Sequence, residues 1–358
     1  ARLYFIVWIY SAEKLCEPTF ASSLRLADLL CGRFLVKTLL MSTDDQDPRD
    51  FFLEGLDLSS CRVEFSEKPI VLLCGGQVRF KEHPDHDDPP ILSLRHAIAN
   101  ATTSFEVFRP EEIDNWHSDA MFKDLVSFEK ELASVCGMIV IVLESAGALV
   151  ELGAFSQLPQ LSDKLIAIIS TNFSDDISFI NLGVLRFIQK SKSASVKSYP
   201  WCLIDKNSIT ANLVDDVIAD IQQELNNLPK TQIFRITEDS HIIVAICEIL
   251  KIFIALKEGE IFEYLSVLKI VLDRERLRGQ LFLLQKFHLV KTAKYSDATF
   301  YMRTTENYHR LRLSAKNGLP PIDAVRVTLQ CREFYAKNAK QRNRLRAIEH
   351  SGRAGNGL

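Results

Sequence analysis

Residues 136–156 read CGMIVIVLESAGALVELGAFS, in which an apolar run passes through a turn of small residues into a second apolar segment. The run Met138–Leu143 has the length and composition of a buried strand, and the segment that starts near Ala146 has helical spacing. Two carboxylates, Glu144 and Glu151, stand on either side of the turn. A strand that runs straight into a helix has no structural need of them, so the pair marks a candidate site.

The segments around this stretch alternate between strand and helix patterns. The other predicted strands are Pro69–Cys74, Phe105–Phe108 and Lys164–Ser170, and the predicted helices between them are Leu92–Ala101 and 122–136. Strands that alternate with helices form a parallel sheet with crossover connections. We therefore expect residues 68–205 to form an α/β domain with a doubly wound parallel sheet.

Beyond residue 205 the pattern changes to mainly helical spacing, which predicts a helical linker and a winged-helix domain over residues 206–320. Within it, a helix at Arg274–Gln285 precedes two strands, Leu289–Ala293 and Thr299–Arg303, around a turn at Tyr295. A helix followed by such a hairpin is typical of a winged helix, which binds either nucleic acid or protein.

The two ends of the chain are expected to lie outside these domains. Residues 1–67 are assigned to an N-terminal extension, and Met41 opens a stretch that looks like an ordinary polar protein start. We therefore expect residues 1–40 to lie upstream of the native start. Residues 321–358 are expected to form a basic helix, Cys331–Arg353, and a tail, and the helix is either a solvated face or a surface for phosphates.

Composition excludes several classes of protein. A formal net charge of −3 over 358 residues argues against a protein that coats nucleic acid. The eight cysteines form no CxxC pair and have no zinc-finger spacing, so we expect reduced thiols in a cytoplasmic protein. His83 and His86 lie among acidic residues, but a flexible polar loop is the favoured interpretation, and we expect no metal and no cofactor. No apolar run reaches the length of a membrane span.

The candidate site residues lie at and beyond the ends of two predicted strands. In open α/β sheets, ligands bind beyond the carboxyl ends of the strands. Gly75 and Gly76 lack a β-carbon, so a ligand can approach their backbone closely. Two carboxylates at a sugar-sized crevice suit cleavage of a glycosidic bond, whose transition state resembles an oxocarbenium ion. The alternatives are that Glu151 is an acid favoured by the helix macrodipole, and that the glycines form a plain turn.

Other polar residues are also candidates for the pocket. Arg109 and Glu111 follow the second strand and either rim the pocket or form a solvated loop. Asn181 has a structural role such as helix entry, contacts the site of a neighbouring subunit, or has a role in the pocket. The residues predicted to be catalytic are Glu151 and Glu144, and those predicted to bind substrate are Cys74, Gly75, Gly76, Arg109, Glu111, Ser145, Gly147 and Asn181.

Several segments together resemble the effector proteins of bacterial retrons that are described as ribosyltransferase/DNA-binding proteins. They are LLCGG at 72–76, FRPEE at 108–112, SFEKELASVCGMIVIVLESAGALVELGAFS at 127–156, KLIAI at 164–168 and SFINLGVLRF at 178–187. The resemblance covers about residues 68–320. It implies a first domain similar to nucleoside 2-deoxyribosyltransferases and a winged-helix second domain.

This resemblance implies roles for the two glutamates. The nucleophile of the transferases, in an ELG motif, falls on Glu151, and the acid that contacts sugar hydroxyls falls on Glu144. The loop Cys74–Gly76 lines the same pocket. The transferases have Asp before the turn and Gly-Thr within it, whereas this chain has Glu144 and Gly147-Ala148. The departure favours hydrolysis of a different N-glycoside.

The expected function is that of a toxic effector in retron anti-phage defence. It would cleave an N-glycosidic bond of NAD or a related nucleotide once released from the retron reverse transcriptase and its multicopy single-stranded DNA. The alternatives are a salvage nucleoside deoxyribosyltransferase and a non-enzymatic nucleotide-sensing or DNA-binding regulator. We expect no membrane contact. The sequence leaves open whether the chain forms a homo-oligomer.

Overall fold

The computed structural model describes residues 47–80, 90–113, 122, 124–174 and 177–354. The chain divides into two compact units, Ala1–Phe51 and Phe52–Leu358, and the description below concerns the second. The predictions made for residues 1–40 and for His83 and His86 lie outside the described residues. Within the described part, no helix is long and apolar enough to cross a membrane.

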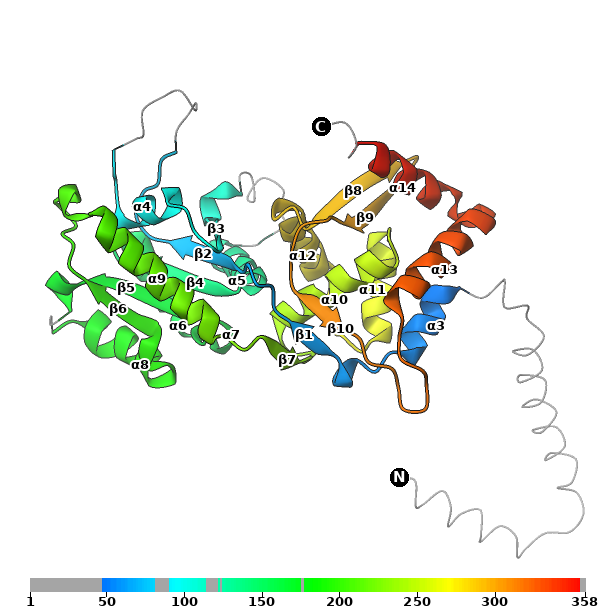
Figure 1. Ribbon diagram of the computed structural model, residues 1–358, viewed down its shortest axis with the longest axis horizontal. Coiled ribbons are helices and arrows are strands. Elements are labelled where there is room, and N and C mark those ends of the chain that lie inside the picture. The colour runs from blue at the N-terminus through cyan, green and yellow to red at the C-terminus, as the bar shows by residue number, and fades with distance from the viewer. Residues whose placement is uncertain (1–46, 81–89, 114–121, 123, 175–176, 355–358) are drawn as a thin grey trace, which may run out of the picture. The chain divides into compact units, whose positions relative to one another are not determined.

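A five-stranded parallel sheet is the centre of the first half of this unit (Figure 1). Its strands are β2 (Ile70–Cys74), β3 (Glu106–Phe108), β4 (Met138–Val142), β5 (Leu165–Ser170) and β6 (Val196–Tyr199). They lie in the order β3-β2-β4-β5-β6, and every neighbouring pair is parallel. The predicted α/β class is confirmed.

Helices cover both faces of this sheet, because successive side chains of a strand point to opposite faces. Val71 and Leu73 pack with α4 (Leu94–Asn100) and α9 (Ala211–Asn227) in one apolar core. Leu72 and Cys74 belong to the other core, which also contains side chains of the remaining helices of this half. Those helices are α5 (Leu125–Val135), α6 (Ala146–Ser156), α7 (Pro159–Ser162), the π-helical turn η4 (Ile180–Leu185) and α8 (Arg186–Ser191).

A second sheet joins segments that are far apart in the sequence. Strand β1 (Arg62–Glu64) lies between β7 (Thr231–Ile233) and β10 (Arg310–Arg312) and is antiparallel to both. Part of the predicted N-terminal extension, which also includes α3 (Pro48–Gly55), is therefore the central strand of a sheet. None of these three-residue strands was predicted.

The helices of the second half precede a two-stranded hairpin. Helices α10 (Asp239–Ile252), α11 (Glu258–Val267) and α12 (Arg274–Lys286) are followed by β8 (Val290–Tyr295) and β9 (Ala298–Arg303). Leu256, before α11, also pairs with Tyr301 of β9. Ser296 in the hairpin turn has a φ of 56°. The predicted pair of strands is confirmed.

The C-terminal region departs from the prediction of one helix at Cys331–Arg353. The chain forms α13 (Ala324–Lys337) and α14 (Arg342–Ala354), with a break at Asn338. The extended backbone of Asn338 ends α13, and its side chain accepts a hydrogen bond from the Lys340 backbone at 2.9 Å. A short side-chain cap of this kind competes with a continuous helix.

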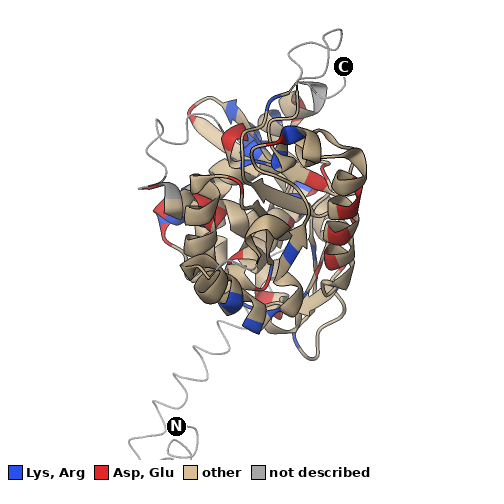
Figure 2. Ribbon diagram, turned by 90° about the vertical axis from the view of Figure 1, so that its left-hand side faces the viewer, with Lys and Arg blue, Asp and Glu red and all other residues tan. Residues whose placement is uncertain are grey.

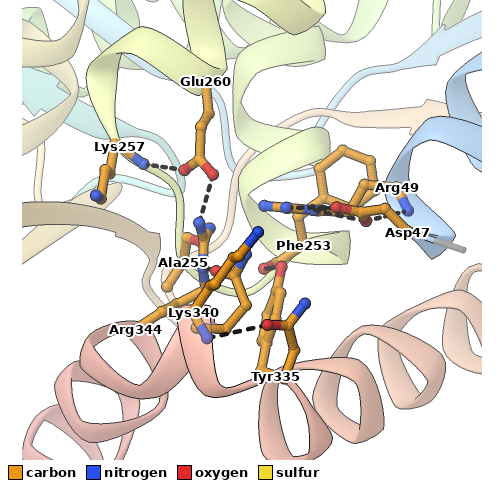
Figure 3. Close-up of polar contacts among 11 residues, drawn as sticks. Asp47, Arg49, Phe253, Ala255, Lys257, Glu260, Tyr335, Lys340 and Arg344 are labelled. Atoms are coloured by element: carbon orange, nitrogen blue, oxygen red, sulfur yellow. Dashed lines mark hydrogen bonds and ion pairs between the residues drawn. The ribbon is translucent and has the colours of Figure 1, made fainter. Parts of the chain in front are cut away.

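Both terminal helices are attached to the helices that precede the hairpin (Figure 3). The Tyr335 hydroxyl of α13 donates to the Phe253 carbonyl at 2.9 Å. The Arg344 guanidinium of α14 donates to the Ala255 carbonyl and to the Glu260 carboxylate of α11. These contacts place the basic C-terminal region beside the hairpin, against which α14 also packs.

Candidate active site at the carboxyl end of the parallel sheet

The sheet has a topological switch point at the carboxyl end of β2. Strand β3 lies on one side of β2, and the chain then returns to place β4 on the other side. Ligands of doubly wound sheets bind at such a point, because the loops from the two strands diverge and leave a crevice. The structure brings the loop after β2 and the turn after β4 together there: the Gly76 N–H donates to Glu144 Oε1 at 3.1 Å.

Gly75 and Gly76 are required by close packing at this point. Gly75 has a φ of 151°, and a β-carbon on it would lie 3.0 Å from the Val142 carbonyl oxygen. A β-carbon on Gly76 would lie 2.8 Å from Ser93 Cβ and 2.9 Å from Glu144 Oε1. The φ of Gly75 and the short distances at Gly76 both disfavour a residue with a side chain, so this path of the loop requires glycine at both positions.

Glu144 holds the start of α4. Besides Gly76, its carboxylate accepts hydrogen bonds from the Leu94 N–H at 2.9 Å and the Arg95 N–H at 3.0 Å. A carboxylate at a helix N-terminus satisfies N–H groups that have no partner in the helix and is favoured by the helix macrodipole. Sequence reasoning assigned only a sugar contact to Glu144 and missed this structural role.

Ser145 and Gly147 shape the start of α6. The Ser145 hydroxyl accepts a hydrogen bond from the Ala148 N–H at 3.2 Å and donates to the Gly75 carbonyl at 3.1 Å. It therefore caps α6 and joins it to the loop after β2. Gly147 is exposed, and a β-carbon on it would meet only Ser145 Oγ, at 3.9 Å.

Glu151 lies in the second turn of α6, where its Oε2 atom is buried and has no hydrogen-bond partner among the described residues. Burial raises the pKa of this carboxyl above its ordinary value. The positive charge of Arg95 and a hydrogen bond from the Cys74 thiol act in the opposite direction. A buried carboxylate oxygen without a partner is costly and is a recognised sign of a functional site.

Two further residues complete this cluster and were missed from the sequence. Arg95 is 3% exposed, and its guanidinium holds Glu111 through two bonds, at 2.8 and 2.6 Å. Glu129 of α5 is 7% exposed. Burial raises the pKa of Glu129 to about 7, and the negative charges of Glu151 and Glu111 add to the effect. The carboxyl groups of Glu111 and Glu151 therefore lie near Arg95, and Glu129 lies near these two carboxyl groups.

A comparison with known protein families identifies this region. The model of the STM3845 retron effector protein family matches residues 92–292, a range that contains Glu111, Glu129, Glu144 and Glu151. The chain belongs to this family of retron effectors.

Two Escherichia coli proteins are similar to part of the effector. The "Retron Ec86 putative ribosyltransferase/DNA-binding protein" is 35% identical over 133 residues, which are 36% of this chain and 40% of that protein. The Retron Ec73 protein with the same description is 36% identical over 131 residues, again 36% of this chain and 40% of the relative. The effector thus aligns with less than half the length of either relative.

Arg109 and Glu111 line a cavity of about 420 Å³ in the effector, together with Gln77, Val78, Arg79 and Leu92. Arg109 pairs with Glu112 at 3.0 Å and lies 3.9 Å from the centre of the Phe80 ring. Because Arg95 binds Glu111, this cavity adjoins the carboxyl cluster. Both residues line this cavity, and their predicted role in binding substrate remains a prediction.

Asn181 has a different position. Its side-chain amide donates to the Phe173 carbonyl at 2.6 Å and so attaches η4 to the segment after β5. It lines a separate cavity of about 400 Å³, together with Ser174, Arg186, Gln189 and Ser198, among others. The predicted role of Asn181 in binding substrate remains a prediction.

Proposed function

We propose that the effector hydrolyses the N-glycosidic bond of a nucleotide and that Glu151 is the residue at the reacting carbon. The observation that carries this proposal is the buried Glu151 Oε2 atom, which has no partner within the described chain although it lies in a cluster with Arg95, Glu111 and Glu129. A carboxylate oxygen that the fold leaves without a partner can approach a developing oxocarbenium ion.

In this mechanism the bond between the anomeric carbon and the base nitrogen breaks, and the base leaves with the electron pair. The Glu151 carboxylate attacks or shields the anomeric carbon from one side. When the base is a purine or pyrimidine, Glu129, whose pKa of about 7 lets it hold a proton near neutral pH, donates that proton to the leaving base. The nicotinamide of NAD leaves as a neutral molecule and needs no proton, so for NAD Glu129 starts ionised and only accepts the proton from water. Water then supplies a hydroxyl group to the anomeric carbon and returns a proton to Glu129.

Glu144 positions the site and retains capacity to bind sugar. Its Oε2 atom accepts a hydrogen bond from the Leu94 N–H, and a carboxylate oxygen has two lone-pair sites. A ribose hydroxyl can therefore donate to the same oxygen without breaking the start of α4. This combines the contact expected from the sequence with the role that the fold gives Glu144.

The adjoining cavity supports a nucleotide rather than a nucleoside as the substrate. Arg79 and Arg109 both line it, and guanidinium groups bind phosphate through paired hydrogen bonds. NAD and related dinucleotides place phosphates next to the ribose whose bond is broken. The reaction needs no cofactor, because water is the acceptor.

The second half of the chain is proposed to bind the retron's reverse transcriptase and its single-stranded DNA in the cytoplasm. The order of α10, the Leu256 bridge, α11, α12 and the hairpin follows the order of elements in a winged helix. Exposed cations of β8 and α14, Lys291, Lys294 and Arg342, give this end positive charge for phosphates. The elements of the parallel-sheet half carry both acidic and basic residues (Figure 2).

Base release tests the proposed reaction. Purified effector is incubated with NAD, NADP, ATP and a panel of nucleosides, with and without a second free base, and the products are separated by chromatography. The proposal requires base release without a second base. Product that forms only with a second base would instead show a deoxyribosyltransferase.

A cellular assay tests the proposal for the case in which the purified effector is inactive without a trigger. Expression of the parent is expected to arrest growth, whereas expression of Glu151→Gln is not. If neither protein released base or arrested growth and a nucleotide still bound, the chain would be a sensor or regulator and the proposed reaction would be wrong.

A further inference from the structure

Helix α5 contains two buried glutamates that point in different directions. Glu129 and Glu131 are two residues apart, and side chains with this spacing lie on different faces of a helix. Glu129 interacts electrostatically with Glu151 and Glu111 in the candidate site. Glu131 instead accepts hydrogen bonds from α12. One helix therefore links the site to the second half of the chain.

The polar contact between α5 and α12 is centred on Arg276. Its Nε atom lies 2.7 Å from Glu131 Oε1, and one of its terminal nitrogens lies 2.6 Å from Asp239 Oδ1 at the start of α10. The Gln280 amide, which is fully buried, donates to Glu131 Oε2 at 3.3 Å. Buried polar groups of this kind contribute to one specific arrangement of packed helices more than to stability.

Close apolar packing surrounds these polar groups. A β-carbon on Gly279 of α12 would lie 3.1 Å from Phe122 Cε1. Phe122 in turn lies edge-on against Phe128 of α5, with ring centres 5.2 Å apart. The absence of a side chain at Gly279 thus lets α12 approach the aromatic side chains beside α5.

The carboxyl end and the middle of α5 are held by different parts of the chain. At its carboxyl end, Lys164 donates to the Ala133 carbonyl at 2.6 Å, and the Tyr308 hydroxyl donates to the Val135 carbonyl at 2.9 Å. In the middle of α5, Glu131 accepts hydrogen bonds from Arg276 and Gln280 of α12. Loss of the α12 contact would therefore loosen the part of α5 that carries Glu129.

We infer that Glu131 and Arg276 are positioning residues: their contact holds α5 so that Glu129 stays buried beside Glu151, which makes the state of the site depend on α12. The charged and titratable groups around Glu129 are Glu151 of α6, Glu111 after β3 and Cys74 at the end of β2, and Arg95 of α4 acts on these three groups. Glu131, Arg276 and Asp239 lie on the side of α5 that faces α12 and α10. The effect of this contact on catalysis rests on the proposed function, but its effect on the position and burial of Glu129 does not.

Titration of Glu129 in the full chain tests this inference without substrate. Carboxyl carbons are labelled with carbon-13 in all glutamates, and the signal that disappears in Glu129→Gln is assigned to Glu129. In the parent this signal is expected to titrate near 7, and in Arg276→Gln its midpoint should fall toward the ordinary value of 4.5, because water reaches the group. Glu131→Gln, which keeps the size of the side chain, should change the midpoint in the same direction.

Arg278→Gln is the matched control. Arg278 also lies on α12, but it is 54% exposed and pairs with Glu258 of α11 at 2.8 Å. Its replacement should leave the Glu129 midpoint unchanged. An unchanged midpoint in folded Arg276→Gln and Glu131→Gln, or an equal fall in Arg278→Gln, would overturn the inference.

The same variants separate this inference from the proposed function. If the parent releases base, the pH profile of release should move in Arg276→Gln by the same amount as the Glu129 midpoint. If the midpoint moves but the parent neither releases base nor arrests growth, the proposed reaction fails and the positioning role stands.

Discussion

Burial of Glu129 leads to a prediction about stability. In the folded chain, burial raises the pKa of this carboxyl from 4.5 to about 7. One unit of pKa corresponds to about 1.4 kcal/mol, so ionisation of Glu129 in the folded chain costs about 3 kcal/mol relative to the unfolded chain. Glu129→Gln removes the ionisable group and preserves its size, so it should remove this cost.

The sign follows from proton binding. The folded chain binds the proton of Glu129 more tightly than the unfolded chain does. The folded state is therefore free of the ionisation cost below pH 4.5, and its stability falls by that cost as pH rises through 7. Glu129→Gln and the parent should therefore have similar free energies of unfolding at about pH 4.5, whereas at about pH 8 the variant should be more stable by up to about 3 kcal/mol.

Urea unfolding followed by circular dichroism at both pH values measures this difference. Glu349→Gln, at an exposed position of α14, controls for the general effect of an amide replacing a carboxylate. A difference between Glu129→Gln and the parent that is the same at both pH values would refute the assignment of a buried, proton-holding carboxyl. Base release by Glu129→Gln should fall in the same preparation, so stability and activity should change in opposite directions.

Three further predictions concern the loops and the basic end. Gly76→Ala should lower the free energy of unfolding by about 1–3 kcal/mol, because its β-carbon would lie 2.8 Å from Ser93 Cβ, which cannot move without its backbone. Gly147→Ala should not lower it, and equal values for the two variants in urea unfolding would contradict the packing argument. Glu144→Gln should lower the free energy of unfolding by about 1–3 kcal/mol in the same assay, because the amide nitrogen of Gln cannot accept a hydrogen bond from a backbone N–H. An unchanged free energy of unfolding would show that these hydrogen bonds are not needed for stability. Lys291→Ala and Lys294→Ala should each reduce the slope of the logarithm of the single-stranded DNA binding constant against the logarithm of salt concentration by about 1. An unchanged slope would show that these lysines do not contact the DNA phosphates.

The parallel sheet could be predicted because its strands are short apolar runs. IVLLC at Ile70–Cys74 and MIVIV at Met138–Val142 are buried throughout, as a strand covered on both faces requires. The meeting of Gly76 and Glu144 also follows from the sequence, because the carboxyl ends of neighbouring parallel strands share one edge of the sheet. Local pattern and topology were sufficient for these features.

Arg95 and Glu129 could not be predicted in the same way. Charged residues in amphipathic helices are usually exposed, and the burial of these two depends on where α4 and α5 pack. One signal was present: Glu129 directly follows Phe128, in a stretch with helical spacing of apolar residues. The strands β1, β7 and β10 have only three residues each, and their partners are distant in the sequence, so no local pattern indicates them.

The most direct test of the central claim is the rate of base release by Glu151→Gln at a nucleotide concentration that saturates both proteins. Binding of the nucleotide, measured by calorimetry, should be retained, because Gln keeps the size of the side chain. Release should fall on the order of a thousandfold or more, since the residue at the reacting carbon is lost. A variant that binds the nucleotide and releases base as fast as the parent would contradict the role of Glu151.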